Sequence, residues 1–386
     1  MTPQGLTLRQ LGPAIFLPSG VYSIGLGAVA PVVALSATGL GASFAVAAVV
    51  AGMVGVGQIL GSIPAGVLVS RIGERRTMLL GAACAVPALL ACVVAGHVLL
   101  LAFAVMLVGM AGATWGVARH AFMTEAVRPE LRARAMSTLG GVGRIGTFAG
   151  PFAGAGAVHV MGLKGAYLVA LGCSLLAGVL LMLLPSVPHS SSSGAERLKL
   201  ISVVRDNSTT LRTLGFGVLL VGALRASRQT ILPLWGAQLG LSPATIGLIF
   251  GISGGVDMLL FYPAGKLMDR HGRKAAAVPA MALLGTAFAL LPLTSGMVGL
   301  TLAGVLMGIG NGLSAGLVMT IGADVSPAAG RARFLGVWRV FSDLGTGGGP
   351  LLIGAVTAVA SLTASAVVVG SAGLLAALLL SRWLTR

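Results

Sequence analysis

Apolar runs of membrane-spanning length recur along the chain, and they constrain the fold more than any other feature. We place these runs near residues 12–36, 43–70, 76–95, 97–126, 133–161, 165–185, 210–237, 242–269, 275–294, 297–325, 332–360 and 363–384. A helix of about 20 predominantly apolar residues crosses a bilayer. Only 9% of the residues are charged, which is too few to cover a water-soluble domain. The sequence therefore predicts an all-α membrane protein with twelve transmembrane helices.

Basic residues gather in the loops on one side of these predicted helices. That side and the polar segments hold eighteen of the 25 Lys and Arg: Arg9, Arg71, Arg75, Arg76, Arg128, Arg132, Arg134, Arg197, Lys199, Arg205, Arg212, Arg270, Arg273, Lys274, Arg331, Arg333, Arg382 and Arg386. The opposite loops hold one basic residue, Lys164. The positive-inside rule therefore predicts a multi-pass protein of the cell (plasma or inner) membrane, with both termini in the cytoplasm. The net charge of +16 then reflects this topology and attraction to membrane lipid, so we expect no nucleic-acid partner.

One phrase occurs twice, as PAGVLVSRIGERR from Pro64 and as PAGKLMDRHGRK from Pro263, 199 residues later. The same shift places Gly109 on Gly308 and Pro151 on Pro350, without a gap. We therefore predict two six-helix halves of the same topology, residues 1–185 and 210–386, joined by a cytoplasmic linker, residues 186–209. Parallel repeats of this kind place one binding site between two halves that rock against each other.

This repeated loop resembles the signature of the major facilitator superfamily, Gly-x-x-x-Asp-Arg-x-Gly-Arg-Arg. The second half matches at Gly265, Asp269, Arg270, Gly272, Arg273 and Lys274, and the first half at Gly66, Arg71, Gly73, Arg75 and Arg76. The first half departs from the signature because Ser70 replaces the acid and Glu74 is inserted before the basic pair. The resemblance implies the twelve-helix fold of that family and a transport function.

The resemblance also implies that each loop acts as a cytoplasmic gate, since the acid lies beside the positive start of a helix in the other half. We expect Asp269 near Arg132 and Arg134, and Ser70 near Arg331 and Arg333 with a hydrogen bond at most. Glu125 and Asp324 are expected to pair with Arg71 or Arg75 and with Arg270 or Arg273. The missing acid at Ser70 predicts an uneven gate that favours opening to the cytoplasm.

A second motif, Gly146-x-x-x-Gly150-Pro151-x-x-Gly154, lies in the fifth predicted helix. It resembles the glycine-proline motif of proton-coupled exporters, although Ser137 and Ala155 replace glycines of that pattern. Glycines four residues apart let another helix approach closely, and a proline bends the helix. The motif therefore indicates export, or alternatively a seam of small residues that serves packing alone.

Charged residues inside the predicted spans are hypotheses for functional sites, because charge is costly in hydrocarbon. In the resembled family the fifth helix packs against the eighth. Arg144 and Asp257 lie at similar predicted depths, roughly 16–18 Å from the cytoplasmic ends of these helices at 1.5 Å per residue. We therefore predict that they pair across the halves, as a latch or as a static contact. Gln58 and Asp343, at the repeat positions, are expected to face each other likewise.

Four spans line the central cavity in the resembled family, namely the first, fourth, seventh and tenth. The candidate cavity residues on them are Tyr22, Trp115, Arg119, His120, Arg225, Arg228, Gln229 and Asn311. Several cations around one cavity attract an anionic substrate, but each arginine could instead bind helix-end carbonyls. His120, Asp257 and Asp343 are competing candidates for carrying a proton, and His120 could instead be a hydrogen-bonded packing residue.

The leading hypothesis is a secondary active transporter that works by alternating access and exports small organic molecules, with the proton gradient as driving force. One alternative is an organic-anion carrier for uptake or exchange, and another is a non-transporting receptor on the same fold. The sequence has no G-x-x-x-x-G-K-[ST] loop for ATP and no catalytic or metal-site spacing, so we expect no enzyme activity, cofactor or metal. We expect a monomer whose partners are its small-molecule substrate and membrane lipid.

Overall fold

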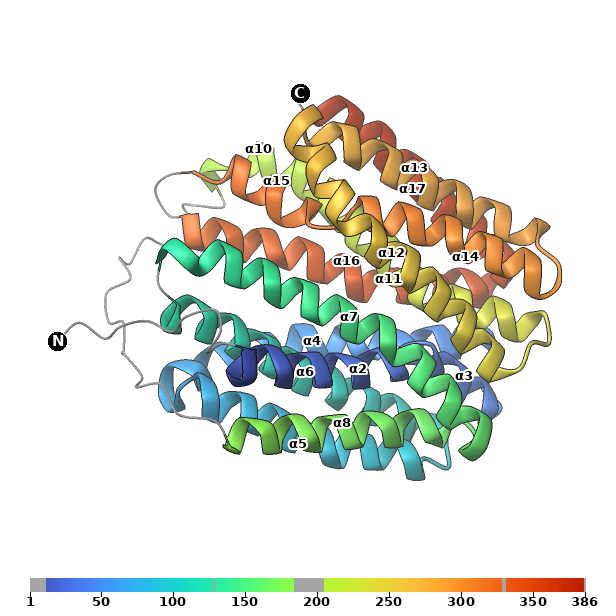
Figure 1. Cartoon of the computed structure of the whole chain (residues 1–386). Helices are drawn as coiled ribbons and strands as arrows, with labels where there is room; N and C mark the ends of the chain where they lie inside the picture. The colour runs from blue at the N-terminus through green and yellow to red at the C-terminus, as the bar shows by residue number, and fades with distance from the viewer. Residues whose placement is uncertain (1–11, 128, 184–204, 328–330, 385–386) are drawn as a thin grey trace. The chain divides into compact units, whose positions relative to one another are not determined.

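The computed structural model describes residues 12–127, 129–183, 205–327 and 331–384, and these residues are overwhelmingly helical (Figure 1). The first half contains η1 (Gly12–Phe16), α2 (Leu17–Val29), α3 (Val32–Gly39), α4 (Phe44–Ile72), α5 (Glu74–Val94), α6 (Val98–Ala126), α7 (Pro129–Met161) and α8 (Lys164–Leu183). The second contains α10 (Ser208–Thr210), η2 (Leu211–Gly215), α11 (Phe216–Gln238), α12 (Pro243–His271), α13 (Arg273–Leu290), η3 (Leu291–Leu293), α14 (Gly296–Leu313), α15 (Leu317–Val325), α16 (Arg331–Val359) and α17 (Leu362–Trp383). Each of the twelve predicted spans corresponds to one helix or to consecutive helical segments.

Nine of these spans within the described residues are long and apolar enough to cross a membrane. The other three long helices are α7, α11 and α16, in which arginine and glycine residues lower the mean hydropathy. The twelve-helix prediction is therefore consistent with the structure, and the less apolar helices are those that carry the predicted glycine motif and several of the charges within the spans.

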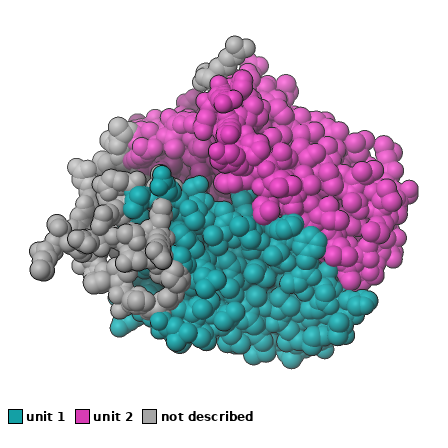
Figure 2. Space-filling model, in the orientation of Figure 1, with its two compact units in different colours: residues 1–41, 53–193 teal, residues 42–52, 194–386 magenta. Residues whose placement is uncertain are grey.

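The chain divides into two compact units, coloured separately in Figure 2. Unit 1 comprises residues 1–41 and 53–193, and unit 2 comprises residues 42–52 and 194–386. The helix α4 therefore contributes to both units. The predicted linker, residues 186–209, lies outside the described residues up to residue 204, so its boundaries remain a prediction.

Glycines bring helix backbones into direct contact inside each unit, at positions that obey the 199-residue repeat. In unit 1, a methyl group on Gly150 of α7 would overlap the carbonyl oxygen of Ile24 in α2. In unit 2, the same change at Gly349 of α16 would overlap the carbonyl oxygen of Ala223 in α11. Both members of each contact are shifted by 199 residues, so the two units repeat the same backbone packing.

The repeat extends to α6 against α4 and α14 against α12. A methyl group on Gly109 would overlap the carbonyl oxygen of Val54, and one on Gly308 would overlap that of Ser253, again 199 residues on. Apolar side chains gain little by leaving lipid for a helix contact, so close backbone approach is a main source of packing energy in a membrane. The glycine motif of the fifth span thus forms a packing seam against the first span.

The repeated loops explain two of the signature glycines. Gly73 precedes α5 with φ 83° and ψ 167°, and Gly272 precedes α13 with φ 83° and ψ 168°. This region of backbone conformation is open essentially to glycine alone. The loop therefore requires glycine at these positions, whatever residues surround it.

Two of the predicted spans are interrupted. The tenth, predicted as one run over 297–325, ends its first helix at Leu313 and begins a second at Leu317, with Gly316 between them at φ 77°. The first span likewise changes from α2 to α3 at Ala30 and Pro31. The corresponding α6 of unit 1 is continuous, so the break after Leu313 belongs to the second half only.

Substituting Gly150 by Ala is expected to lower the free energy of unfolding by about 1–3 kcal/mol, because the added methyl group forces α7 and α2 apart. Gly349→Ala is expected to give a similar loss, since its contact is the repeated one. Thermal unfolding of the purified protein measures both changes.

The matched control is Gly156→Ala in the same helix, where a methyl group would meet no atom within 4 Å. This change is expected to be neutral or to stabilise by up to about 1 kcal/mol, because alanine favours the helix. Equal losses at positions 150 and 156 would show that the seam does not set the helix spacing.

Candidate functional site

A chain of polar side chains connects three helices in the interior of unit 2. Arg225 and Arg228 come from α11, Ser253 and Asp257 from α12, and Asn311 from the last turn of α14. Ser253 and Asp257 are four residues apart and therefore share one face of α12. We call these five residues the polar network.

Arg228 lies at the centre of one half of the network. Its Nη1 lies 3.7 Å from Asp257 Oδ2, and its Nη2 donates to Ser253 Oγ over 2.9 Å. Ser253 in turn donates to the carbonyl oxygen of Gly304. The guanidinium lies 5.6 Å from the centre of the Phe250 ring, and only 6% of the Arg228 side chain is exposed. Charge pairing, hydrogen bonding and a cation–π contact together compensate its burial.

Asn311 connects the other arginine to the same carboxylate. Its Nδ2 donates to Asp257 Oδ2 over 2.6 Å, and its Oδ1 accepts from Arg225 Nε over 3.1 Å. One oxygen of Asp257 therefore interacts with both Arg228 and Asn311. Hydrogen-bonded chains of this kind polarise one another in a low-dielectric interior.

The glycine seam between α14 and α12 sets the geometry of Asn311. Gly308 packs against the backbone of Ser253, and a methyl group on Gly312 would lie 2.8 Å from the carbonyl oxygen of Asp257. These glycines flank Asn311 in sequence. The close approach of the two backbones therefore brings the short amide side chain within reach of the carboxylate.

The structure brings together four residues that the sequence assigned to two different roles. Arg225, Arg228 and Asn311 were expected in the substrate cavity and Asp257 in a pair between the halves. Gln229 is exposed on α11, whereas its neighbour Arg228 is buried. Sequence reasoning missed Ser253 and Phe250, although the four-residue spacing from Ser253 to Asp257 could have indicated the former.

Inside unit 2, Asp257 is held by Arg228 and Asn311, and the pairing of Asp257 with Arg144 remains a prediction. Asp343 forms an ion pair with Arg339 one turn before it, 3.7 Å from Nε to Oδ2. Gln58 is half-buried and its backbone carbonyl accepts from Ser62 Oγ. The expected approach of Gln58 and Asp343 likewise remains a prediction.

In unit 1, the predicted cavity residues include an aromatic pair. The rings of Tyr22 in α2 and Trp115 in α6 stack in parallel, with centroids 4.5 Å apart, and both side chains are buried. His120 Nδ1 lies 2.7 Å from the carbonyl oxygen of Gly116 in its own helix. Arg119 is half-buried one turn after Trp115. The carbonyl contact holds one ring nitrogen of His120, and its role as a proton carrier remains a prediction.

The signature loop of unit 2 is built around Arg273. Its Nε donates to Asp324 Oδ2 over 2.8 Å, and its Nη1 lies 3.4 Å from Asp269 Oδ1. The sequence predicts that Asp324 pairs with Arg270 or Arg273, and in the structure its partner is Arg273. Arg273 therefore links the end of α12 to the end of α15.

The signature loop of unit 1 uses a different anchor. Arg75 donates through Nε and Nη2 to the carbonyl oxygen of Leu181, over 3.0 and 2.7 Å, and through Nη2 to Met182. It thereby binds the last carbonyls of α8, where a cation is favoured. Ser70 Oγ donates to Val67 in its own helix. The side chain of Glu125 lies outside the described residues, as do those of Arg132 and Arg333.

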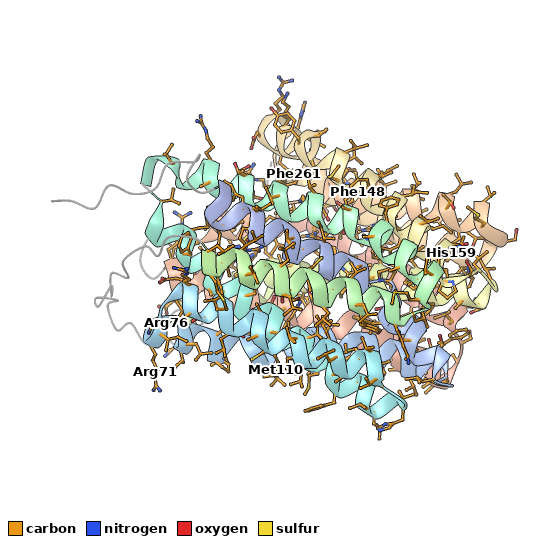
Figure 3. All side chains as sticks on the ribbon, turned by 60° about the horizontal axis from the view of Figure 1, so that its bottom comes forward. Arg71, Arg76, Met110, Phe148, His159 and Phe261 are labelled. Atoms are coloured by element: carbon orange, nitrogen blue, oxygen red, sulfur yellow. The ribbon has the colours of Figure 1, made fainter. Side chains whose placement is uncertain are left out.

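Figure 3 shows Arg71 and Arg76 at one end of unit 1 and His159 at the opposite end. The basic loop of the first half thus lies at the end that the positive-inside rule assigns to the cytoplasm. Among the described residues no group of three or more His, Cys, Asp or Glu is arranged to hold a metal ion.

Two similarly built units of long apolar helices, with a charged network inside one of them, define a multi-pass membrane transporter. The sequence profile of the Major Facilitator Superfamily matches residues 15–226 and 214–386, so that its two matches cover nearly the whole chain. The chain therefore belongs to the major facilitator superfamily.

Solved transporters share this fold at low sequence identity. A POT family transporter in complex with a thioalcohol-conjugated peptide gives a TM-score of 0.81 at 13% identity, over 96% of this chain and 95% of that one. The nucleoside transporter NupG gives 0.76 at 13%, over 99% and 100%. The human organic anion transporter MFSD10 (TETRAN) gives 0.68 at 18%, over 97% and 100%. No curated protein matches the sequence. At these identities the likeness shows the fold alone.

Removing one partner from the buried pair of Arg228 and Asp257 is expected to destabilise the protein strongly. Arg228→Met and Asp257→Leu should each lower the free energy of unfolding by about 3–5 kcal/mol, because the remaining charge stays buried. The double variant should lose much less than the sum. Thermal unfolding of the four proteins of this cycle measures the coupling.

The matched control is the pair of Arg339 and Asp343, whose side chains are 50% and 31% exposed. The same cycle there is expected to give a coupling of no more than about 0.5 kcal/mol. Equal coupling in the two cycles would contradict the assignment of Arg228 and Asp257 as a buried pair.

Proposed function

We propose that this transporter works by alternating access, uses the proton gradient as its driving force and exports small organic molecules. The observation that carries this proposal is the Asp257 carboxylate, which one buried arginine and one asparagine share inside unit 2. A titratable group in the hydrocarbon region that is tied to other helices can couple a proton to a rearrangement.

A proton on Asp257 would change the whole network. The neutral carboxyl no longer compensates the charge of Arg228, whose side chain is buried, so the pair loses its attraction. Asn311 would then bind a weaker acceptor and would transmit the change to Arg225, which it already contacts. Protonation therefore biases the relative positions of α11, α12 and α14.

Asp257 also lies at a suitable depth for this role. Twelve residues of α12 separate it from Asp269 in the signature loop, which at 1.5 Å per residue is about 18 Å of helix. This distance is a little more than half of a hydrocarbon core of about 30 Å. A proton would reach it from either side as the transporter alternates.

The direction of transport and the location in the cell membrane have less direct support than the role of Asp257. The seam of Gly146, Gly150 and Gly154 against α2 is the packing expected of the exporter-type motif. Gly345 and Gly349 form the same seam against α11, so the packing is common to both halves, and the direction rests on the resemblance. The basic loops support a cytoplasmic position for this side of the protein.

An organic-anion carrier is a second candidate, favoured by the charge of the network. The network contains two guanidinium groups and one carboxylate, and Arg228 Nε is buried without a hydrogen-bond partner among the described residues. A substrate carboxylate could accept from this donor. The third candidate is a non-transporting receptor. A receptor has no transport cycle, so proton coupling through the network would have no role in it.

Transport by Asp257→Asn tests the coupling. Wild-type protein in proteoliposomes is expected to accumulate ethidium, an organic cation, or p-aminohippurate, an organic anion, when a pH gradient is imposed. Asp257→Asn should abolish this accumulation but retain counterflow of the same compound, because exchange needs no net proton movement. The choice of compound separates cation export from anion transport.

Asp343→Asn is the matched control, since Asp343 is the other acid away from the ends of the predicted spans and pairs on its own helix. It should retain both accumulation and counterflow. If Asp343→Asn lost accumulation and Asp257→Asn kept it, the proton site would be assigned to the wrong acid. If neither compound moved nor shifted the unfolding temperature, the receptor reading would replace the proposal.

The two signature loops generate a further prediction about gating. In unit 2, Arg273 joins Asp269 to Asp324, whereas Ser70 in unit 1 bonds only to its own helix among the described residues. Ser70→Asp is expected to reduce the population open to the cytoplasm, and Asp269→Ser to increase it. Thiol labelling of a cysteine placed at a predicted cavity position measures both. A shift in the same direction by the two changes, or no shift by Ser70→Asp, would contradict an uneven gate.

A further inference from the structure

Lys164 is the one basic residue in the loops opposite the basic side, and it stands at a cavity in unit 1. The cavity has a volume of about 140 Å³ and lies where α3 and α5 end and α6 and α8 begin. Figure 3 places His159, in the last turn of α7, at this end of unit 1, away from Arg71 and Arg76. The cavity therefore lies at the end that the topology rule assigns to the outside.

The lining of this cavity is mostly apolar with a few polar groups. Leu40, Val93, Leu101 and Leu163 supply apolar surface. Tyr167 donates to Ser36 Oγ over 3.0 Å, and both residues are buried. Among the described residues this is the only hydrogen bond of the Ser36 hydroxyl, so its own proton remains available to a ligand.

The rim carries a positive charge. Lys164 is exposed, is the first residue of α8 and forms no ion pair with a described residue. The start of a helix adds positive potential to that of the ammonium group. An anionic group at the mouth of the cavity would meet both.

The internal repeat shows that an aromatic side chain packs at this end of each unit. In unit 2 the position of Ser36 is taken by Trp235, and that of Ala95 by Thr294, both 199 residues on. The indole of Trp235 is 3% exposed, and its Nε1 donates to Thr294 Oγ1 over 3.0 Å. At the repeat position of Tyr167 unit 2 has Ala366, so each unit places one buried aromatic side chain here, unit 1 from α8 and unit 2 from α11.

Tyr167 enters from α8 and takes up part of the space in unit 1, since its hydroxyl reaches Ser36. The remaining 140 Å³ is close to the volume of about 150 Å³ in which an apolar cavity binds benzene. A single aromatic ring is thus the size of ligand that the cavity accepts.

We propose that this cavity is a binding site for a small aromatic carboxylate. The ring lies among the leucines that line the cavity, next to Tyr167, and the carboxylate lies at the rim beside Lys164. The site is separate from the polar network of unit 2. Because the ligand contacts four helices at once, its binding stabilises unit 1 by mass action.

Calorimetric titration of the purified full chain with benzoate, and with its neutral isostere benzamide, tests this site. Wild-type protein is expected to bind benzoate saturably and about twofold to fivefold more tightly than benzamide, the range for an exposed ion pair. Lys164→Gln should remove this difference and leave benzamide binding unchanged.

Two variants fill the cavity. Ser36→Phe places a ring where the repeat has Trp235, and Ala95→Met fills the space from α5 while leaving the pair of Ser36 and Tyr167 intact. Both are expected to abolish benzoate binding, because each places side-chain atoms in the space that the ligand ring would take.

Three results would overturn the proposal: no saturable binding of benzoate to the wild type, binding that survives both filling variants, or a preference for benzoate that survives Lys164→Gln. Benzoate binding lost in Arg228→Gln but kept in Ser36→Phe would place the ligand at the polar network instead. Because binding is measured without transport, failure here is distinct from failure of the proposed export function.

Discussion

Direct contact between helix backbones at glycine is the interaction on which the rest of each unit depends. Lipid offers apolar side chains almost the same surroundings as a helix interface, so attraction between helices comes from atoms packed at short range. The contacts of α7 with α2 and of α16 with α11 provide this packing and recur 199 residues apart. The seam of α14 on α12 does more, because it carries Asn311 to the carboxylate of Asp257. Packing and chemistry are thus joined at one interface.

The polar network has little tolerance for an unmatched charge. In water an exposed ion pair contributes little, whereas a buried carboxylate or guanidinium without its partner raises the free energy of the folded state by several kcal/mol. Arg228 therefore binds Asp257, Ser253 and the face of Phe250 together. The same sensitivity suits the proposed mechanism, in which one proton on Asp257 would change the balance of the whole network.

Much of the fold could be predicted from the sequence, because span length, the repeat and the signature loop are local patterns. The types of the network residues were also informative, since charge inside a span is rare. The partner of Asp257 within unit 2 was not predicted, because depth along a helix cannot choose between arginines on different helices. The break at Gly316 was not predicted, because the chain has 59 glycines and a glycine alone does not mark the end of a helix. The cavity beside Lys164 could not be predicted, because its lining comes from α3, α5, α6 and α8, which meet only in the folded unit.

The break between α14 and α15 has a mechanical consequence. Asn311 lies before the break and Asp324 after it, so the network and the signature loop of unit 2 are attached to separate rigid segments. Trp338 of α16 donates to the carbonyl oxygen of Val318 and packs against Gly322, which fastens α15 to α16. The tenth span therefore consists of two helices joined at a break, and the second of them, α15, is bound to α16, whereas α6 is one continuous helix. Tilting of α16 would move α15 and the signature loop of unit 2, while α14 and its Asn311 stay in place.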